Sequence, residues 1–182
     1  ESLAADAALA IDSARLYRET RDKAKIEHEM ALARTIQAAM LREPPQVGFA
    51  EIHALSQPAR SVGGDLYFAG VRPDGAVVTA VGDVSGKGVA AALIMAMAQG
   101  LLALVTDLGL PFGEVVSALD RNLATFLPGN RFLTLGACLL HPDGHLVAVN
   151  GGHCPLVVVR RDGRMETIDP TGPVIGLLPG AR

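Results

Sequence analysis

Apolar residues are spaced in different ways along the chain, and each spacing predicts a different kind of helix. The first 43 residues contain no Gly or Pro, which predicts one helix of about 60 Å at 1.5 Å per residue. Residues 89–105 are helix formers that are apolar nearly all round, which predicts a buried helix. Residues 111–127 have amphipathic helical spacing, so Asp120 and Arg121 are expected to face water.

Short apolar runs bounded by turn residues predict strands in the remainder of the chain. Strands over 64–71 and 76–83 would be joined by a loop centred on Asp74. Two further hairpins are predicted around Asp-Gly turns, namely 131–140 with 145–149 and 155–160 with 164–168. These turns predict meandering antiparallel strands.

The first predicted helix has a charged middle and a short apolar seam. Opposite charges four residues apart, such as Glu19 and Lys23, can pair on a helix surface. A seam with coiled-coil spacing follows, formed by Ile26, Met30, Ala33, Gln37 and Met40. The seam covers barely two heptads, so packing on the chain's own domain is an alternative. We favour a homodimer, because a domain would have to bury the charged segment.

Two aspartates lie nine residues on either side of Asp74. In a register centred on Asp74, Asp65 and Asp83 are directly opposite, with Cβ atoms roughly 5 Å apart. Like charges there repel, and a hard divalent cation with carboxylate ligands would offset the repulsion. Gly63, Gly64 and Gly82 beside them are expected to leave backbone open to an ion or ligand. We predict half of a metal site; in another register the aspartates would be solvated strand-end residues on opposite faces.

Five segments carry a family pattern, in this order: Arg60-Ser-Val-Gly-Gly-Asp65-Leu-Tyr, Gly82-Asp83-Val-Ser-Gly-Lys-Gly-Val-Ala-Ala-Ala92, Phe132-Leu-Thr-Leu135, Asn150-Gly-Gly-His153-Cys-Pro155 and Gly172-Pro-Val-Ile-Gly-Leu-Leu-Pro179. This pattern resembles the bacterial PPM (PP2C-type) serine/threonine phosphatases of the stage-II-sporulation-E, sigma-regulatory class, and the first two segments together are highly specific. The resemblance implies an α+β fold, an α-β-β-α sandwich of two antiparallel sheets flanked by helices.

The resemblance also implies a two-metal site. In that family two Mn²⁺ or Mg²⁺ ions lie between the sheets, and a metal-bound water attacks phosphoserine or phosphothreonine. Asp65 and Asp83 match metal ligands that act through that water, Val84 matches a backbone carbonyl ligand, and Arg60 resembles a phosphate-binding arginine. Arg60 could instead be an exposed surface charge. Two cations can lower the pKa of a bridging water, so no side-chain nucleophile is needed. His153 is interpreted as a turn residue rather than a ligand.

The sequence departs from the family at its C-terminal end. It stops at Gly180-Ala-Arg182, where the family continues into an Asp-Gly motif and a final Asp that supply further ligands. Two carboxylates are few for two tightly held ions, because magnesium prefers six-fold oxygen coordination. We expect weak metal binding and little turnover from these residues alone. Missing strands would also leave sheet edges that favour pairing with another chain.

The resemblance implies an upstream sensor and a protein substrate. Residues 3–17 resemble the terminal helix of a GAF sensory domain, and 33–45 resemble the linker before this phosphatase class. We therefore divide the chain into a signalling helix, 1–43, and a truncated PP2C-like domain, 44–182. The implied substrate is a small phosphorylated anti-sigma-factor antagonist of the STAS type. The alternatives are a pseudophosphatase that binds partners without turnover and a dimerising signal-transmission element.

Composition argues against several other classes. A chain of 182 residues with 49% hydrophobic residues can bury one sizeable core. A net charge of −3 and the absence of Trp argue against nucleic-acid binding. Cys138 and Cys154 are too few for a zinc motif and are expected to be reduced thiols, as in cytoplasm. The run 89–105 is short for a membrane helix. We expect a cytoplasmic protein without a membrane partner.

Overall fold

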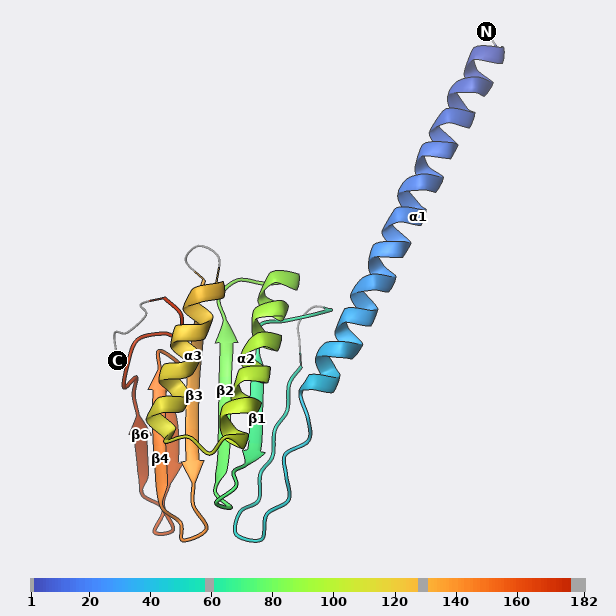
Figure 1. Cartoon of the computed structure of the whole chain (residues 1–182). Helices are drawn as coiled ribbons and strands as arrows, with labels where there is room; N and C mark the ends of the chain where they lie inside the picture. The colour runs from blue at the N-terminus through green and yellow to red at the C-terminus, as the bar shows by residue number, and fades with distance from the viewer. Residues whose placement is uncertain (1, 58–60, 128–130, 178–182) are drawn as a thin grey trace.

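The chain forms one long helix followed by an α+β domain (Figure 1). The computed structural model describes residues 2–57, 61–127 and 131–177, with side chains from residue 5 onward. The elements in chain order are α1 (Ser2–Met40), β1 (Leu66–Val71), β2 (Val77–Val84), α2 (Val89–Asp107), α3 (Phe112–Phe126), β3 (Leu133–Leu140), β4 (Leu146–Gly151), β5 (Leu156–Val159) and β6 (Met165–Ile168).

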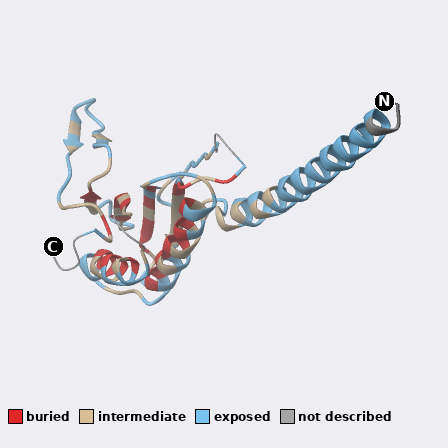
Figure 2. Cartoon of the chain, turned by 90° about the horizontal axis from the view of Figure 1, so that it is seen from above, coloured by how far each residue is buried: buried red, intermediate tan, exposed pale blue. Residues whose placement is uncertain are grey.

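The strands form two antiparallel sheets. Four of them make a sheet of order β1-β2-β3-β4, and β5 pairs only with β6. Helices α2 and α3 lie side by side across one face of the four-stranded sheet (Figure 1), and the β5-β6 hairpin projects away from it (Figure 2). The α+β class and the three hairpins agree with the sequence prediction, because each tight turn joins strands that are neighbours in the chain.

The core lies between the four-stranded sheet and its two helices. Strand β2 alternates in its second half, so that Ala80, Gly82 and Val84 are buried while Val81 and Asp83 are exposed. The largest fully buried apolar side chains come from both layers and include Met95, Leu102, Leu119, Leu123, Leu133 and Leu135. Figure 2 shows this burial on the sheet and on the helix faces turned toward it. The other sheet face carries the exposed Asp83.

Helix α2 is less buried than its sequence predicts. Ala91, Met95 and Leu102 are fully or nearly fully buried, whereas Leu93 and Leu104 are 67% and 55% exposed. The prediction of burial all round was therefore wrong, because the sheet and α3 cover only part of the helix surface. In the described part of the chain, α2 alone is long and apolar enough to cross a membrane, and 44% of it is buried within the domain.

Asp120 of α3 does not face water as predicted. It is only 2% exposed, and its Oδ1 accepts the backbone N–H of Gly176 at 2.7 Å. Ile175, next to that glycine, is fully buried and pairs with the start of β3 at Leu133. The carboxylate thus satisfies a main-chain donor where the chain returns to the core, a role that the helical periodicity of α3 does not reveal.

The C-terminal turns of α1 pack against the domain. Met30, Ala33, Gln37 and Met40 are half-buried, whereas Ile26 is 59% exposed. Gln37 fixes this contact, because its amide nitrogen donates to the Gly63 carbonyl at 2.8 Å and its oxygen accepts the Gly63 N–H at 3.0 Å. Most of the predicted seam is therefore partly covered. Exposed apolar side chains of α1 lie both farther toward the N-terminus, such as Leu9 and Leu16, and beside the seam at Leu32 and Ile36.

Thr106 on α2 offers a test of this packing. Its side chain is 1% exposed, and its Oγ1 has no hydrogen-bond partner among the described residues. Valine has nearly the same shape without the hydroxyl, so Thr106→Val removes the cost of burying an unpaired polar group. We expect the free energy of unfolding to rise by about 1 kcal/mol, measured by urea denaturation. A decrease would show that the hydroxyl is paired in solution.

Candidate active site

The turn between β1 and β2 has the register that the sequence predicts. Leu66 pairs with Gly82 and Val71 with Val77, so continuing the ladder by one residue places Asp65 opposite Asp83. Asp74 fixes the loop length, because its carboxylate accepts the Ala76 N–H and bonds Arg72. Two exposed acids, Asp65 and Asp83, therefore meet at one end of the sheet.

The glycines beside the acids have a different role from the predicted one. A Cβ at Gly64 would lie 2.8 Å from the Val84 carbonyl oxygen, and a Cβ at Gly82 would lie 2.7 Å from the Thr134 carbonyl oxygen. Because these glycines have no side chain, neighbouring backbone packs directly against them, and no space is left there for a ligand. Gly64 and Gly82 position the acid pair by allowing the chain segments around it to approach closely.

The electrostatics of the pair agree with this geometry. Partial burial raises the pKa of Asp83 above its ordinary value, and the negative charge and hydrogen bond of Asp65 raise it further. The nearby His153 lowers the pKa of Asp83 by a smaller amount. A carboxylate whose ionisation is disfavoured by a neighbouring carboxylate is stabilised by a bound cation, since hard divalent ions take carboxylate oxygens as ligands. The acid pair therefore suits cation binding.

The raised pKa of Asp83 predicts a pH-dependent change in stability. The protonated form is favoured in the folded chain, so this contribution is fully present below the unfolded pKa of about 4 and is lost as pH rises through the higher folded value. Asp83→Asn mimics the protonated form. In metal-free buffer we expect the variant to melt at a higher temperature than the parent at pH 7, with the difference vanishing at acidic pH. A destabilised variant at pH 7 would contradict the repulsion.

Strand β3 brings further polar groups to the acids. Thr134 pairs with Asp83 across the sheet, and its hydroxyl lies 3.3 Å from the Asp83 carbonyl oxygen. The same hydroxyl is 2.8 Å from Nδ1 of His153. The backbone N–H of His153 donates to Oδ1 of Asn150 at 2.8 Å, which supports its interpretation as a turn residue. Both residues lie in segments of the family pattern, 132–135 and 150–155, but no spacing rule predicts that Thr134 and His153 meet beside Asp83.

The predicted ligand set is only partly assembled. Asp65 and Asp83 lie opposite each other. The Val84 carbonyl oxygen lies next to Gly64, the residue before Asp65. Across residues 2–57, 61–127 and 131–177, no cluster of three or more His, Cys, Asp or Glu residues could hold a metal ion. Arg60 lies outside the described residues. Two carboxylates with exposed surroundings fit a hard cation that keeps most of its ligands as water.

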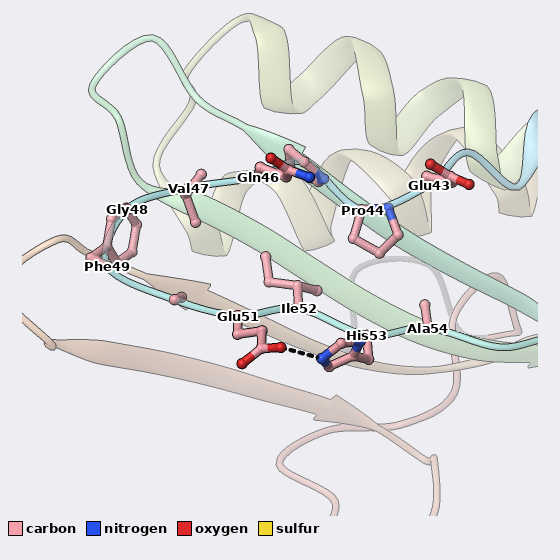
Figure 3. A pocket seen from close by; sticks show the side chains of 12 residues that line it. Glu43, Pro44, Gln46, Val47, Gly48, Phe49, Glu51, Ile52, His53 and Ala54 are labelled. Atoms are coloured by element: carbon pink, nitrogen blue, oxygen red, sulfur yellow. Dashed lines mark hydrogen bonds and ion pairs between the residues drawn. The ribbon is translucent and has the colours of Figure 1, made fainter.

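The loop that follows α1 contains a separate hollow. Its lining consists of residues 43–54, encloses about 730 Å³ and includes an exposed contact of 2.8 Å between Glu51 and His53 (Figure 3). Asp65 and Asp83 do not line it. Because one exposed loop supplies the whole lining, we place the candidate site at the acid pair instead.

The fold is that of the PP2C-like domains of the PPM type. Residues 73–182 match the family model described as Stage II sporulation protein E (SpoIIE), and the chain belongs to this family.

Individual relatives support this assignment. The chain is 28% identical over 159 residues to Protein IcfG of Synechocystis, covering 72% of this chain and 25% of the relative. It is 27% identical over 156 residues to Phosphoserine phosphatase RsbU of Bacillus subtilis, covering 84% and 46%. The chain thus spans less than half of either relative's length.

Solved structures share the fold. The RsbU and RsbW domains of Rv1364c from Mycobacterium tuberculosis match with a TM-score of 0.59 and 29% identity, over 69% of this chain and 35% of that one. The SiaA-PP2C domain of Pseudomonas aeruginosa matches with a TM-score of 0.68 and 20% identity, over 85% and 64%. At that identity the second likeness shows the fold alone.

Proposed function

We propose that this domain hydrolyses phosphoserine or phosphothreonine on a small regulatory protein by metal-dependent catalysis. The observation that carries the proposal is the placement of Asp65 opposite Asp83. Partial burial and the charge of Asp65 raise the pKa of Asp83. A divalent cation would offset the repulsion between the two carboxylates, and the negative charge of a phosphate monoester dianion is likewise offset by bound cations. Family membership supports the same chemistry.

The acid pair and the residue after it would bind the metal. Asp65 and Asp83 would hold Mn²⁺ or Mg²⁺, with the Val84 carbonyl as an additional ligand. Bound metal supplies a water of lowered pKa and a positive charge near the phosphoryl group. The two-ion occupancy of the complete family site is part of the proposal, with partial occupancy expected where only two carboxylates are present.

The proposed substrate is a phosphorylated anti-sigma-factor antagonist of the STAS type. Support comes from the relatives, since one is named a phosphoserine phosphatase, RsbU, and a solved relative joins RsbU and RsbW domains in one chain. The same relatives support a proposed role in a bacterial signalling or stress-response pathway. A phosphorylated STAS protein should lose phosphate when mixed with the longest natural form of this chain and Mn²⁺. Release from unrelated phosphoproteins at the same rate would contradict this specificity.

The helix α1 is proposed to join two copies. Its N-terminal two-thirds exposes large apolar side chains, including Leu9, Ile11, Leu16, Tyr17 and Ile26. Water-exposed apolar surface on a projecting helix is stabilised by pairing with a similar helix. Analytical ultracentrifugation should show a dimer that becomes monomeric when residues 1–25 are deleted. A monomer at all concentrations would contradict this assembly.

A pseudophosphatase is the second candidate. The observation that favours it is the shortage of acids, because the described residues supply two carboxylates and no larger ligand cluster. A pseudophosphatase would bind the phosphorylated partner without releasing phosphate. Turnover from these 182 residues alone is expected to be low for the same reason, and robust turnover would contradict that expectation.

A further inference from the structure

Two contacts hold the ring of His153 and a third holds its backbone. Nδ1 of the ring lies 2.8 Å from the Thr134 hydroxyl, and the backbone N–H of His153 donates to Asn150. A Cβ at Gly136 would lie 3.5 Å from ring carbon Cδ2, so the imidazole lies close over a strand position that has no side chain. Together these contacts hold the residue in place.

The support behind His153 is rigid. Asn150 is fully buried, and its amide nitrogen donates to the carbonyl oxygens of Cys154 and Ile168 at 3.2 and 3.1 Å. Its Oδ1 accepts the His153 N–H, so the amide joins three segments of the chain. A buried and fully used amide of this kind keeps its rotamer, because each broken bond would leave a polar group unpaired. The imidazole is therefore preorganised before any ligand arrives.

One ring nitrogen is left for a ligand. Among the described residues, Nε2 of His153 has no hydrogen-bond partner, while Nδ1 is occupied by Thr134. Thr134 is directly opposite Asp83 in the sheet, so the ring lies on the face and at the end of the sheet where the acids meet. The ring and the acids face the same space, yet no described cluster makes His153 a third metal ligand.

We propose that the Thr134 hydroxyl donates to Nδ1 of His153, so that Nε2 carries the ring proton and donates a hydrogen bond to a phosphoryl or seryl oxygen of the phosphorylated substrate. This inference rests on the proposed phosphatase function and adds a residue to it. A donor at that place would stabilise the charge that develops on the departing oxygen, and its fixed orientation would require no rearrangement during the reaction. Thr134 is a positioning residue in this arrangement, because it acts on the substrate only through His153.

Two substitutions separate substrate contact from a structural role. In His153→Asn the amide lies where Nδ1 was, so the bond to Thr134 can persist while the group at Nε2 is lost. In His153→Gln the longer amide reaches the place of Nε2, while the bond to Thr134 is lost. If Nε2 contacts substrate, kcat/KM for a phosphoserine protein with Mn²⁺ should fall about a hundredfold in the Asn variant. In the Gln variant kcat/KM should fall less than about tenfold.

A larger loss of kcat/KM in the Gln variant than in the Asn variant would overturn the inference. It would show that activity depends on the hydrogen bond to Thr134 and not on a group at the place of Nε2. Equal activity of both variants and the parent would overturn it as well. Melting temperatures of both variants, measured alongside, show whether either loses its fold.

A direct measurement decides the inference even if the parent protein releases no phosphate. The Nε2 nitrogen-15 resonance of His153, assigned by its absence in the Asn variant, should shift saturably when O-phosphoserine is added with Mg²⁺. The resonances of the exposed His53 should stay unchanged. No shift of the His153 resonance at saturating O-phosphoserine would refute the contact. Lack of phosphate release with a normal shift would instead contradict the proposed catalysis and leave the contact established.

Discussion

Replacing Asp83 by Asn in the longest natural form of this chain should lower Mn²⁺-dependent phosphate release by at least about a thousandfold. Asn preserves the size and keeps a single neutral oxygen, but it removes the negative charge that a divalent cation needs. Loss of the bound metal removes both the water of lowered pKa and the positive charge near the phosphoryl group, which together lower the barrier by several kcal/mol. The measurement is phosphate release from a phosphoserine STAS protein.

The matched control for this prediction is Asp143→Asn. Asp143 is an exposed turn residue whose Oδ1 accepts the N–H of His145, and an Asn oxygen can accept the same bond. This variant should keep the parental rate. An Asp83→Asn protein that is folded and releases phosphate at the parental rate would show that Asp83 is not part of the metal site.

Asn150→Ala should lower the free energy of unfolding by about 3 kcal/mol. The substitution removes a fully buried amide and leaves the carbonyl oxygens of Cys154 and Ile168 and the N–H of His153 without their partner. Each unpaired buried polar group costs about 1–3 kcal/mol, although water admitted to the small cavity would recover part of this. Urea denaturation followed by circular dichroism measures the difference.

Asn122→Ala provides the comparison on the same domain. The Asn122 side chain is exposed on α3 and donates only to the Ala118 carbonyl of its own helix. Its replacement should change the free energy of unfolding by less than about 0.5 kcal/mol. Similar effects of the two substitutions would mean that the buried Asn150 network contributes little to stability.

The sequence predicts those parts of the site that depend on local geometry. The symmetric spacing of Asp65 and Asp83 about Asp74 gives the correct register, because a tight turn leaves neighbouring strands one pairing that keeps Ala80 and Val84 in the core. The hairpins are predictable for the same reason. The helices are predictable from composition and from the absence of Gly and Pro in α1.

Long-range contacts could not be predicted in this way. Asp120 has the spacing of a surface residue on α3, and only the return of the chain at Gly176 turns it into a buried acceptor. The Thr134–His153 contact joins residues 19 positions apart on β3 and the turn after β4. The sequence predicts that the backbone at Gly64 is open to a ligand, whereas in the structure the Val84 carbonyl oxygen lies beside it. In each case the partner is brought near by the fold.

The most direct test of the metal-site proposal is an electron paramagnetic resonance titration of Mn²⁺ with the 182-residue chain. The acid pair should bind the ion weakly, and Asp65→Asn or Asp83→Asn should each weaken binding at least about tenfold, because carboxylate charge sets the affinity for a hard cation. Asp143→Asn should leave binding unchanged. If the Asp65 and Asp83 variants bind Mn²⁺ as well as the parent does, the acid pair is not the metal site and the proposed catalysis loses its basis.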